Sequence, residues 1–171
     1  MSVADDENHI DIAAFAPADA AGALDVILPI QQREFGVPIT AVDQPDLAAI
    51  ETFYQSGRGG FWVAKRDGRV VGTIGLKDIG GSEAALRKMF VAAPFRGPRF
   101  GTAKKLLDAL VAHAAERGIK RIFLGTTDKF VAAHRFYERH GFAEIARGDL
   151  PASFPVMAVD SKFYSKEIAL P

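Results

Sequence analysis

A short loop rich in arginine and glycine leads into a segment that favours a helix. The loop carries Arg96, Gly97, Arg99 and Gly101, and Lys104 and Lys105 follow in the next turn. The first turn of a helix presents unpaired N–H groups and the positive end of the helix dipole, which together bind anions. Glycine also lets a backbone approach a phosphate closely. The pattern indicates a diphosphate site, although a plain turn with solvated cations fits the same spacing.

The elements on either side must hold this loop in place. After it, apolar residues recur at i, i+3, i+4, i+7, i+8 and i+11, namely Ala103, Leu106, Leu107, Leu110, Val111 and Ala114. This spacing predicts an amphipathic helix that ends at Arg117-Gly118. Residues 83–92 before the loop and residues 119–125 after the helix predict two strands. A right-handed crossover makes these strands parallel if they share a sheet.

The rest of the chain predicts further strands and helices around this unit. The other expected strands are residues 9–15, 61–65, 70–76, 142–145 and 156–168, and the other expected helices are 17–35, 43–56 and 129–139. Asp67-Gly68 between two β-branched runs indicates a hairpin. Pro29 is expected to bend or split the first helix. The sequence therefore predicts an α/β fold, with a mixed sheet covered by helices on both faces.

The composition is that of an ordinary folded domain. The chain has 171 residues, of which 49% are hydrophobic and 25% charged. Its 21 basic residues balance 21 acidic ones, so no bulk positive field recruits nucleic acid or an anionic membrane. The absence of cysteine excludes a disulfide framework, a thiolate nucleophile and the common zinc-finger spacings. Because no His, Asp and Glu grouping has metal-ligand spacing, no metal is expected.

Residues 1–8 are expected to be flexible, and residues 9–171 are expected to form a single domain. The acidic N-terminus lacks the basic region and apolar stretch of a secretory signal. No window approaches the roughly 18 apolar residues that a membrane-spanning helix needs. We therefore expect a soluble cytoplasmic protein, with a homodimer through the late strands or exposed helix faces left open.

Two segments resemble signature motifs of the GNAT superfamily of N-acetyltransferases. The first, Met89 to Gly101, is similar to the acetyl-CoA loop, whose last six positions read (Arg or Gln)-x-x-Gly-x-(Gly or Ala) in that family. The second, Ala132 to Phe142, resembles the later Ala-x-x-Phe-Tyr-Glu-x-x-Gly-Phe element. One helix and one strand separate them, as the family requires. The resemblance covers the chain from Phe61 onward and implies a GNAT-like mixed sheet of about six or seven strands.

The resemblance also implies a role for each matching residue. Backbone groups of Met89, Phe90 and Val91 would pair with the pantetheine arm of acetyl-CoA like an added strand and hold the thioester carbonyl. The pyrophosphate would be wrapped by Gly97, Arg99, Phe100, Gly101 and Thr102, aided by the charge of Arg96. Tyr137 would protonate the departing CoA thiolate as general acid.

Several positions depart from the family pattern. Arg99 replaces the usual first glycine and Pro98 removes one N–H donor, so a different loop shape or weaker cofactor binding stays open. Many relatives place a base glutamate eleven residues before the signature arginine, where this chain has Ala85. Glu83, two residues earlier on the same strand face, is the substitute candidate for the base, with a solvated strand-end charge as the other interpretation. Phe130 replaces an asparagine that contacts the cofactor.

The sequence contains no motif that identifies the acceptor. Phe35 and Tyr54 fall where the family builds its acceptor-binding lip. Glu34 and Asp160 could pair with an amine, but nothing in the sequence ranks them. His134, one helical turn before the candidate acid, is more often a structural histidine than a proton relay.

These expectations combine into an acetyl-CoA-dependent N-acetyltransferase. Its acceptor would be a primary amine of a small molecule or peptide, which attacks directly in a ternary complex without a covalent intermediate. The alternative is a non-catalytic acyl-CoA-binding regulatory module. Both would bind acetyl-CoA, but only the enzyme would release free CoA when given an amine.

Overall fold

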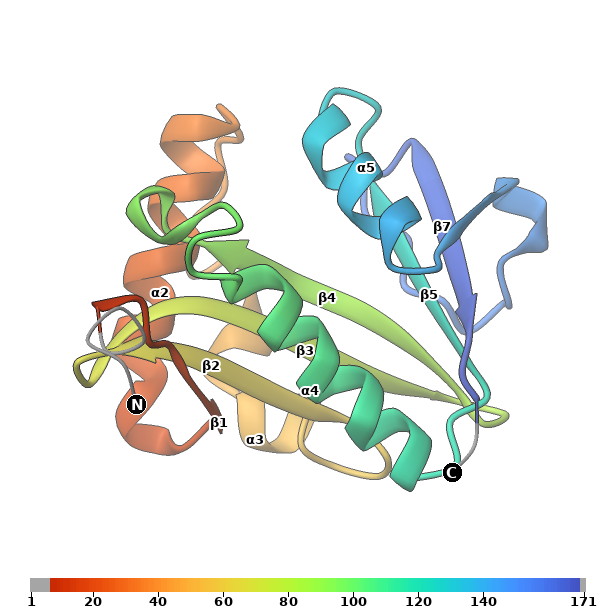
Figure 1. The fold of residues 1–171 in the computed structure, drawn as a ribbon. Helices are drawn as coiled ribbons and strands as arrows, with labels where there is room; N and C mark the ends of the chain where they lie inside the picture. Colours follow the sequence, from red (N-terminus) through yellow and green to blue (C-terminus); the bar gives the residue numbers. More distant parts are fainter. Residues whose placement is uncertain (1–6, 170–171) are drawn as a thin grey trace.

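The structure, a computed structural model, describes residues 7–169 and arranges them around a seven-stranded sheet of order β1-β2-β3-β4-β5-β7-β6 (Figure 1). The strands are β1 Asp11–Ala14, β2 Gly60–Arg66, β3 Arg69–Gly80, β4 Glu83–Val91, β5 Arg121–Thr126, β6 Ala143–Ile145 and β7 Lys162–Glu167. The α-helices are α2 Ala20–Pro29, α3 Ile50–Phe53, α4 Thr102–Glu116 and α5 Val131–Arg139. Shorter helical turns are η1 Pro17–Asp19, η2 Ile30–Glu34, η3 Pro45–Ala48, η4 Ala93–Phe95 and η5 Arg147–Asp149. Of the N-terminal segment expected to be flexible, residues 1–6 lie outside the described residues.

The sheet combines antiparallel and parallel pairing. β1 to β4 are antiparallel neighbours, and the predicted β2–β3 hairpin turns at Asp67 and Gly68, whose φ angles are 51° and 78°. Both values are positive, as a type I′ hairpin turn requires. β4 and β5 are parallel and α4 connects them, which confirms the expected strand, helix and strand unit. β7 pairs antiparallel with both β5 and β6.

Helices cover both faces of the sheet, as the sequence predicts. In Figure 1, α4 and α5 lie on one face, and α2 and α3 lie on the other. The α4 face is packed by Leu106 and Leu110 against Ile74 and Ile122, all fully buried. The opposite face has its own apolar core, which includes Ile27, Ile50, Tyr54 and Phe61. The sheet is therefore a rigid layer between two cores.

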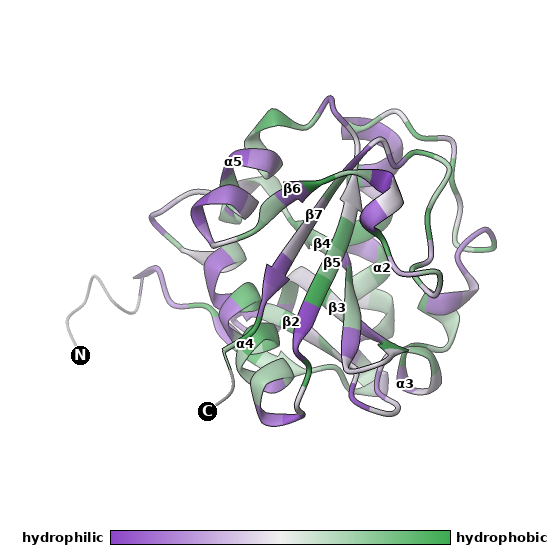
Figure 2. Cartoon of the chain, turned by 90° about the vertical axis from the view of Figure 1, so that its right-hand side faces the viewer, coloured by the Kyte–Doolittle hydropathy of each residue, from purple (hydrophilic) through white to green (hydrophobic). Residues whose placement is uncertain are grey.

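Hydropathy follows these layers (Figure 2). The middle of β5 is apolar and buried, whereas α5 is largely hydrophilic along its length. Among the described residues, no helix is both long enough and apolar enough to cross a bilayer.

Several elements differ from their predicted extents, among them β3, which continues to Gly80 beyond the predicted end at residue 76. The helix expected over residues 43–56 is divided into η3 and α3, because Ala49 between them has φ −140° and ψ 44°. The strand expected over residues 156–168 begins only at Lys162. Met157 and Val159 in the preceding loop are 38% and 56% exposed, so their apolar side chains have no core to face. The first strand is likewise shorter than predicted.

The first long helix widens after Pro29. Proline lacks an N–H and its ring crowds the preceding turn, so the regular hydrogen-bond ladder cannot continue unchanged. The next five residues form the π-helical η2, in which the N–H of Phe35 donates to Ile30 O at 2.9 Å. Figure 1 shows this end of the helix beside the C-terminal end of β4.

Candidate functional site

Two parallel strands diverge at the centre of the sheet. β4 and β5 pair only at Glu83–Arg121, Ala84–Ile122 and Ala85–Phe123. Beyond these pairs the strands separate, and we call the diverging part, residues 86–91 of β4 and 124–126 of β5, the β4–β5 fork (Figure 1). Within the part of the chain that the structure describes, residues 86–91 have a strand partner only on the β3 side. The other backbone edge of β4 can therefore bind an extended ligand.

A β-bulge at Lys88 turns β4 away from β5. Lys88 has a φ of 54°, and the β3–β4 register shifts across it. Such a left-handed residue costs roughly 1–2 kcal/mol, so its neighbours must hold it. The hydroxyl of Thr73 donates to Lys88 O at 2.7 Å, and the Lys88 ammonium donates to Gln44 Oε1 at 2.6 Å. Burial lowers the pKa of this amine, while the charge of Asp46, 3.7 Å away, opposes that shift.

The loop before α4 leaves amide groups free. Gly97 and Gly101 have φ angles of 96° and 61°, so both glycines take left-handed conformations that other residues adopt at a cost. Arg99, which replaces the family's glycine, is not among the positive-φ residues. The first hydrogen bond into α4 runs from Lys105 N–H to Gly101 O at 2.9 Å. The N–H groups of residues 102–104 therefore point out of the helix toward the loop.

The arginines of this loop contact other segments. The Arg96 guanidinium donates to both carboxylate oxygens of Glu34, at 2.8 and 2.6 Å, and to Val91 O at 2.8 Å. This ion pair holds the pKa of Glu34 below its usual value. Arg99 donates to Asn8 Oδ1 at 2.6 Å and lies over the Phe100 ring. Arg96 thus ties the loop to the end of the first long helix, and the helix amides are the groups left for an anion.

Tyr137 and Met89 meet at the fork from different elements. The Tyr137 hydroxyl on α5 lies 3.8 Å from the sulfur of Met89 on β4. The ring is 8% exposed and packs edge-on against Phe142. Burial raises the pKa of the phenol above its ordinary value of 10.0, so the group keeps its proton at neutral pH. A thioether is a weak acceptor, so this hydroxyl is available as a proton donor to an incoming group.

Glu83 lies at the other end of the same strand. It begins β4 and pairs with Gly80 and Arg121, at the closed end of the fork. Glu83 and Met89 are six positions apart along β4, which places them about 20 Å from each other in an extended strand. The structure therefore does not bring Glu83 and Tyr137 together, since a shared strand face does not shorten the distance along the strand. Ala85, where the family has its glutamate, is fully buried in an aromatic cluster.

Of the other candidate residues near the acceptor site, some are buried in the core and one is partly exposed at the surface. Tyr54 is fully buried and its hydroxyl donates to Asp46 Oδ2 at 2.6 Å, so it is a core residue. His134 is also buried, and its Nε2 lies 2.7 Å from Thr127 O, which requires an N–H there and indicates a structural role. Phe35 is 38% exposed and its ring lies 4.0 Å from that of Phe130.

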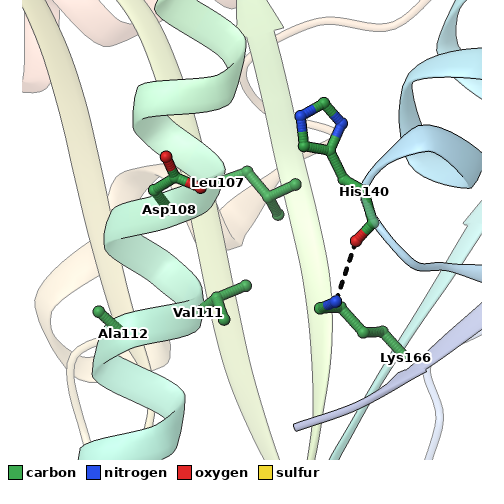
Figure 3. A pocket seen from close by; sticks show the side chains of 6 residues that line it. All are labelled: Leu107, Asp108, Val111, Ala112, His140 and Lys166. Atoms are coloured by element: carbon green, nitrogen blue, oxygen red, sulfur yellow. Dashed lines mark hydrogen bonds between the residues drawn. The ribbon is translucent and has the colours of Figure 1, made fainter. Parts of the chain in front are cut away.

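A separate hollow lies beside the middle of α4 (Figure 3). It has a volume of about 280 Å³ and is lined by Leu107, Asp108, Val111, Ala112, His140 and Lys166. The Lys166 ammonium donates to His140 O at 2.9 Å across one side of it. None of these lining residues belongs to the loop before α4 or to the fork. The hollow is therefore separate from the candidate site, which is formed by that loop and the fork.

Comparison with known proteins gives one consistent family. A model of the acetyltransferase (GNAT) family matches residues 24–142. An acetyltransferase structure of the GNAT family from Staphylococcus aureus is 42% identical, with a TM-score of 0.88 over 94% of this chain and 99% of that one. The uncharacterized N-acetyltransferase YjgM of Escherichia coli is 36% identical over 61% of this chain and 63% of its own length. Human N-acetylaspartate synthetase is 37% identical over 61% of this chain and 34% of its own length. The matched part thus spans between a third and two thirds of these two relatives.

Proposed function

The chain belongs to the GNAT family of acetyltransferases, and on this premise we propose that it moves an acetyl group from acetyl-CoA to a primary amine by direct attack. The observation that carries the proposal is the meeting of three features at one end of β4. These are the unpaired edge of β4, the free amides at the start of α4 and the Tyr137 hydroxyl. An extended diphosphate thioester needs all three kinds of contact.

The residues present fit acetyl-CoA as a substrate. The amides of residues 102–104 would bind the diphosphate with the helix dipole. The free edge at Met89, Phe90 and Val91 would pair with the amide groups of the pantetheine arm. Arg96 would keep the loop in place through Glu34 rather than contact the phosphates. Acetyl-CoA supplies the thioester whose carbonyl carbon the amine attacks.

The protein contributes orientation and proton transfer. Backbone N–H groups of the β4 edge would polarise the thioester carbonyl as negative charge develops on its oxygen. As the new C–N bond forms and the C–S bond breaks, Tyr137 would donate its phenol proton to the departing sulfur. Its buried position keeps that proton in place until the sulfur becomes basic.

Thiol detection with a panel of amines tests this proposal. The purified chain would be incubated with acetyl-CoA and free amino acids, polyamines or short peptides, and CoA release would be followed together with the mass of the product. We expect CoA and an N-acetylated amine in equal amounts, with the protein itself unmodified. Saturable acetyl-CoA binding without CoA release for any amine would instead support the non-catalytic acyl-CoA-binding alternative.

A further inference from the structure

Arg87 is a half-buried cation on the fork, and it forms no ion pair with a carboxylate within the part of the chain that the structure describes. It lies on the face of β4 that carries α3, with its guanidinium 5.6 Å from the Phe53 ring centroid. Its one hydrogen bond among the described residues is to the sulfur of Met157, at 3.5 Å. Because a thioether is a weak acceptor, most of the donor capacity of this guanidinium stays unused. A planar anion that can bind in a bidentate manner, such as a carboxylate, fits the guanidinium best.

The neighbours of Arg87 add positive charge. Lys77, from the next strand, lies over the same Phe53 ring at 4.6 Å and donates to Phe53 O. Lys88 follows Arg87 directly and has Asp46 as its carboxylate neighbour. Three cations thus lie on this face of β3 and β4, and among the described residues only Lys88 has a carboxylate within 4 Å, namely that of Asp46. Their positive charge attracts an acceptor that carries a negative group.

A carboxylate faces the fork from the β5 side. The carboxyl group of Asp160 lies against Gly125, so close that a Cβ there would come within 2.5 Å of Asp160 Oδ2. The same oxygen accepts the backbone N–H of Met157 at 2.8 Å. Met157 therefore touches both charged groups, its N–H at Asp160 and its sulfur at Arg87. The two opposite charges lie near each other without forming an ion pair.

We propose that the acceptor is a free α-amino acid, whose carboxylate binds Arg87 and whose amino group binds Asp160. This inference rests on the proposed acetyl transfer and names its substrate class. A zwitterion matches a cation on one arm of the fork and an anion on the other. A protein lysine or a polyamine lacks the carboxylate that Arg87 requires.

The arrangement also assigns the first proton transfer. Asp160 takes a proton from the bound ammonium, which leaves the nitrogen lone pair free. The amine nitrogen then forms a bond to the thioester carbon and the C–S bond breaks. The sulfur takes the phenol proton of Tyr137, whose side chain reaches the fork from α5. The nitrogen of the new amide still carries two protons and passes one of them to the Tyr137 phenolate. The products are the N-acetylamino acid and CoA, and Asp160 releases its proton to solvent.

Matched acceptors test this inference. Each of the twenty common amino acids would be compared with its carboxamide, with CoA release as the readout and the Kd for acetyl-CoA measured in parallel. We expect KM at least tenfold lower for the best amino acid than for its amide. Arg87→Gln should raise the KM for the amino acid at least tenfold without changing the KM for the amide. Arg87→Lys should raise the KM for the amino acid by a smaller factor, because it keeps the positive charge. Asp160→Asn should lower turnover of both acceptors.

Arg69→Gln, at the exposed first residue of β3, is the matched control and should change neither KM. Equal KM for acids and amides in the unmodified protein, or an Arg87→Gln effect that is the same for both, would overturn the inference and leave the acetyl transfer intact. So would turnover of polyamines alone. If acetyl-CoA binds but no amine of any class releases CoA, the proposed function fails, and the acceptor inference fails with it.

Discussion

Tyr137 is the residue on which the proposed chemistry depends most directly. Its hydroxyl is buried and keeps its proton, and among the described residues it donates a hydrogen bond only to the sulfur of Met89. A tyrosine that served packing alone would be replaceable by phenylalanine without loss. The proposed role predicts a different outcome.

Tyr137→Phe should lower kcat by about 100-fold or more, because general acids typically contribute that much. The Kd for acetyl-CoA should stay the same, since the ring remains in place. The measurement is steady-state CoA release beside a binding titration. Tyr164→Phe is the matched control, because it removes a buried hydroxyl from a ring whose centroid lies 6.0 Å from that of Tyr137. A wild-type kcat for Tyr137→Phe would remove this residue from the mechanism.

Individual residues were predictable from the sequence where a motif fixed their place. The helix of Tyr137 carries a family pattern that predicts its role, and its hydroxyl lies beside β4 in the structure. Strand alternation favours Glu83, but alternation gives the face of a side chain and not its distance along the strand. The sequence carries no signal for Arg87, because its environment comes from Phe53 and Met157, which are far from it in sequence.

The loop before α4 is the element that must keep its shape to bind a diphosphate. Gly97 has a φ of 96°, and a Cβ there would meet nothing within 4 Å. Gly97→Ala therefore strains the backbone without a steric clash, and should cost roughly 1 kcal/mol of stability. We also expect about tenfold weaker acetyl-CoA binding, since a change of about 1.4 kcal/mol in binding corresponds to that factor.

Gly68→Ala provides the matched control for this substitution. Gly68 has a φ of 78° and equally open surroundings, but it lies in the β2–β3 turn. Both variants should lose similar stability in urea denaturation, and only Gly97→Ala should lose acetyl-CoA affinity in calorimetry. Equal affinities for the two variants would contradict the role of the loop.

The Glu34–Arg96 pair couples this loop to η2 at the end of the first long helix. Both side chains are partly exposed, at 38% and 43%, so the pair contributes at most about 1 kcal/mol after solvent screening. Because the folded pKa of Glu34 is lowered, this contribution is present above the usual glutamate value of 4.5 and is lost as the pH falls through the lowered pKa.

Glu34→Gln should therefore reduce the free energy of unfolding by less than about 1 kcal/mol at pH 7, and the difference from wild type should vanish in strong acid. Urea denaturation across pH provides the measurement. Asp108→Asn, which breaks the exposed pair with Lys104 inside α4, should change stability by about 0.5 kcal/mol or less. A Glu34→Gln effect that persists in strong acid would show that the pair is not its cause.

Elements were predictable where one periodicity ran without interruption. The α4 pattern continues from Ala103 to Ala114, and the observed helix covers it. The segment around Ala49 carries a helical pattern too, yet tertiary packing divides it into two turns. The sequence also predicts strand for the loop before β7, but Val159 in that loop faces solvent instead of a core. The local sequence pattern does not show which side of a segment other elements will pack against.

At the scale of the molecule, two apolar cores hold the sheet from opposite sides. Leu110 is fully buried on the α4 side, so Leu110→Ala should lower the free energy of unfolding by about 2–5 kcal/mol. Val111→Ala, at the next and less buried position of the same helix, should lower it by less. Urea denaturation measures both. A small loss at Leu110 would mean that this core does not set the stability of the domain.

The mixed sheet and the helices on both faces could be predicted because alternation and helical spacing are local properties. The site could be predicted only in part, since its remaining contacts join distant segments. Arg96 meets Glu34 across 62 residues, and Arg87 meets Met157 across 70. The bulge at Lys88 that opens the fork has no local signal either, because lysine rarely adopts a φ of 54°.

Acetyl-CoA is expected to lie along the start of α4 and the free edge of β4, and an NMR titration of the isotopically labelled chain detects binding at both places. The backbone amide signals of Thr102, Ala103 and Lys104, and those of residues 89–91, should shift together and saturate at one acetyl-CoA per chain, with a Kd below about 1 mM. If these amide signals do not shift at several times that concentration, or if the shifts cluster around the hollow at Val111 and His140 instead, acetyl-CoA does not bind at the proposed site.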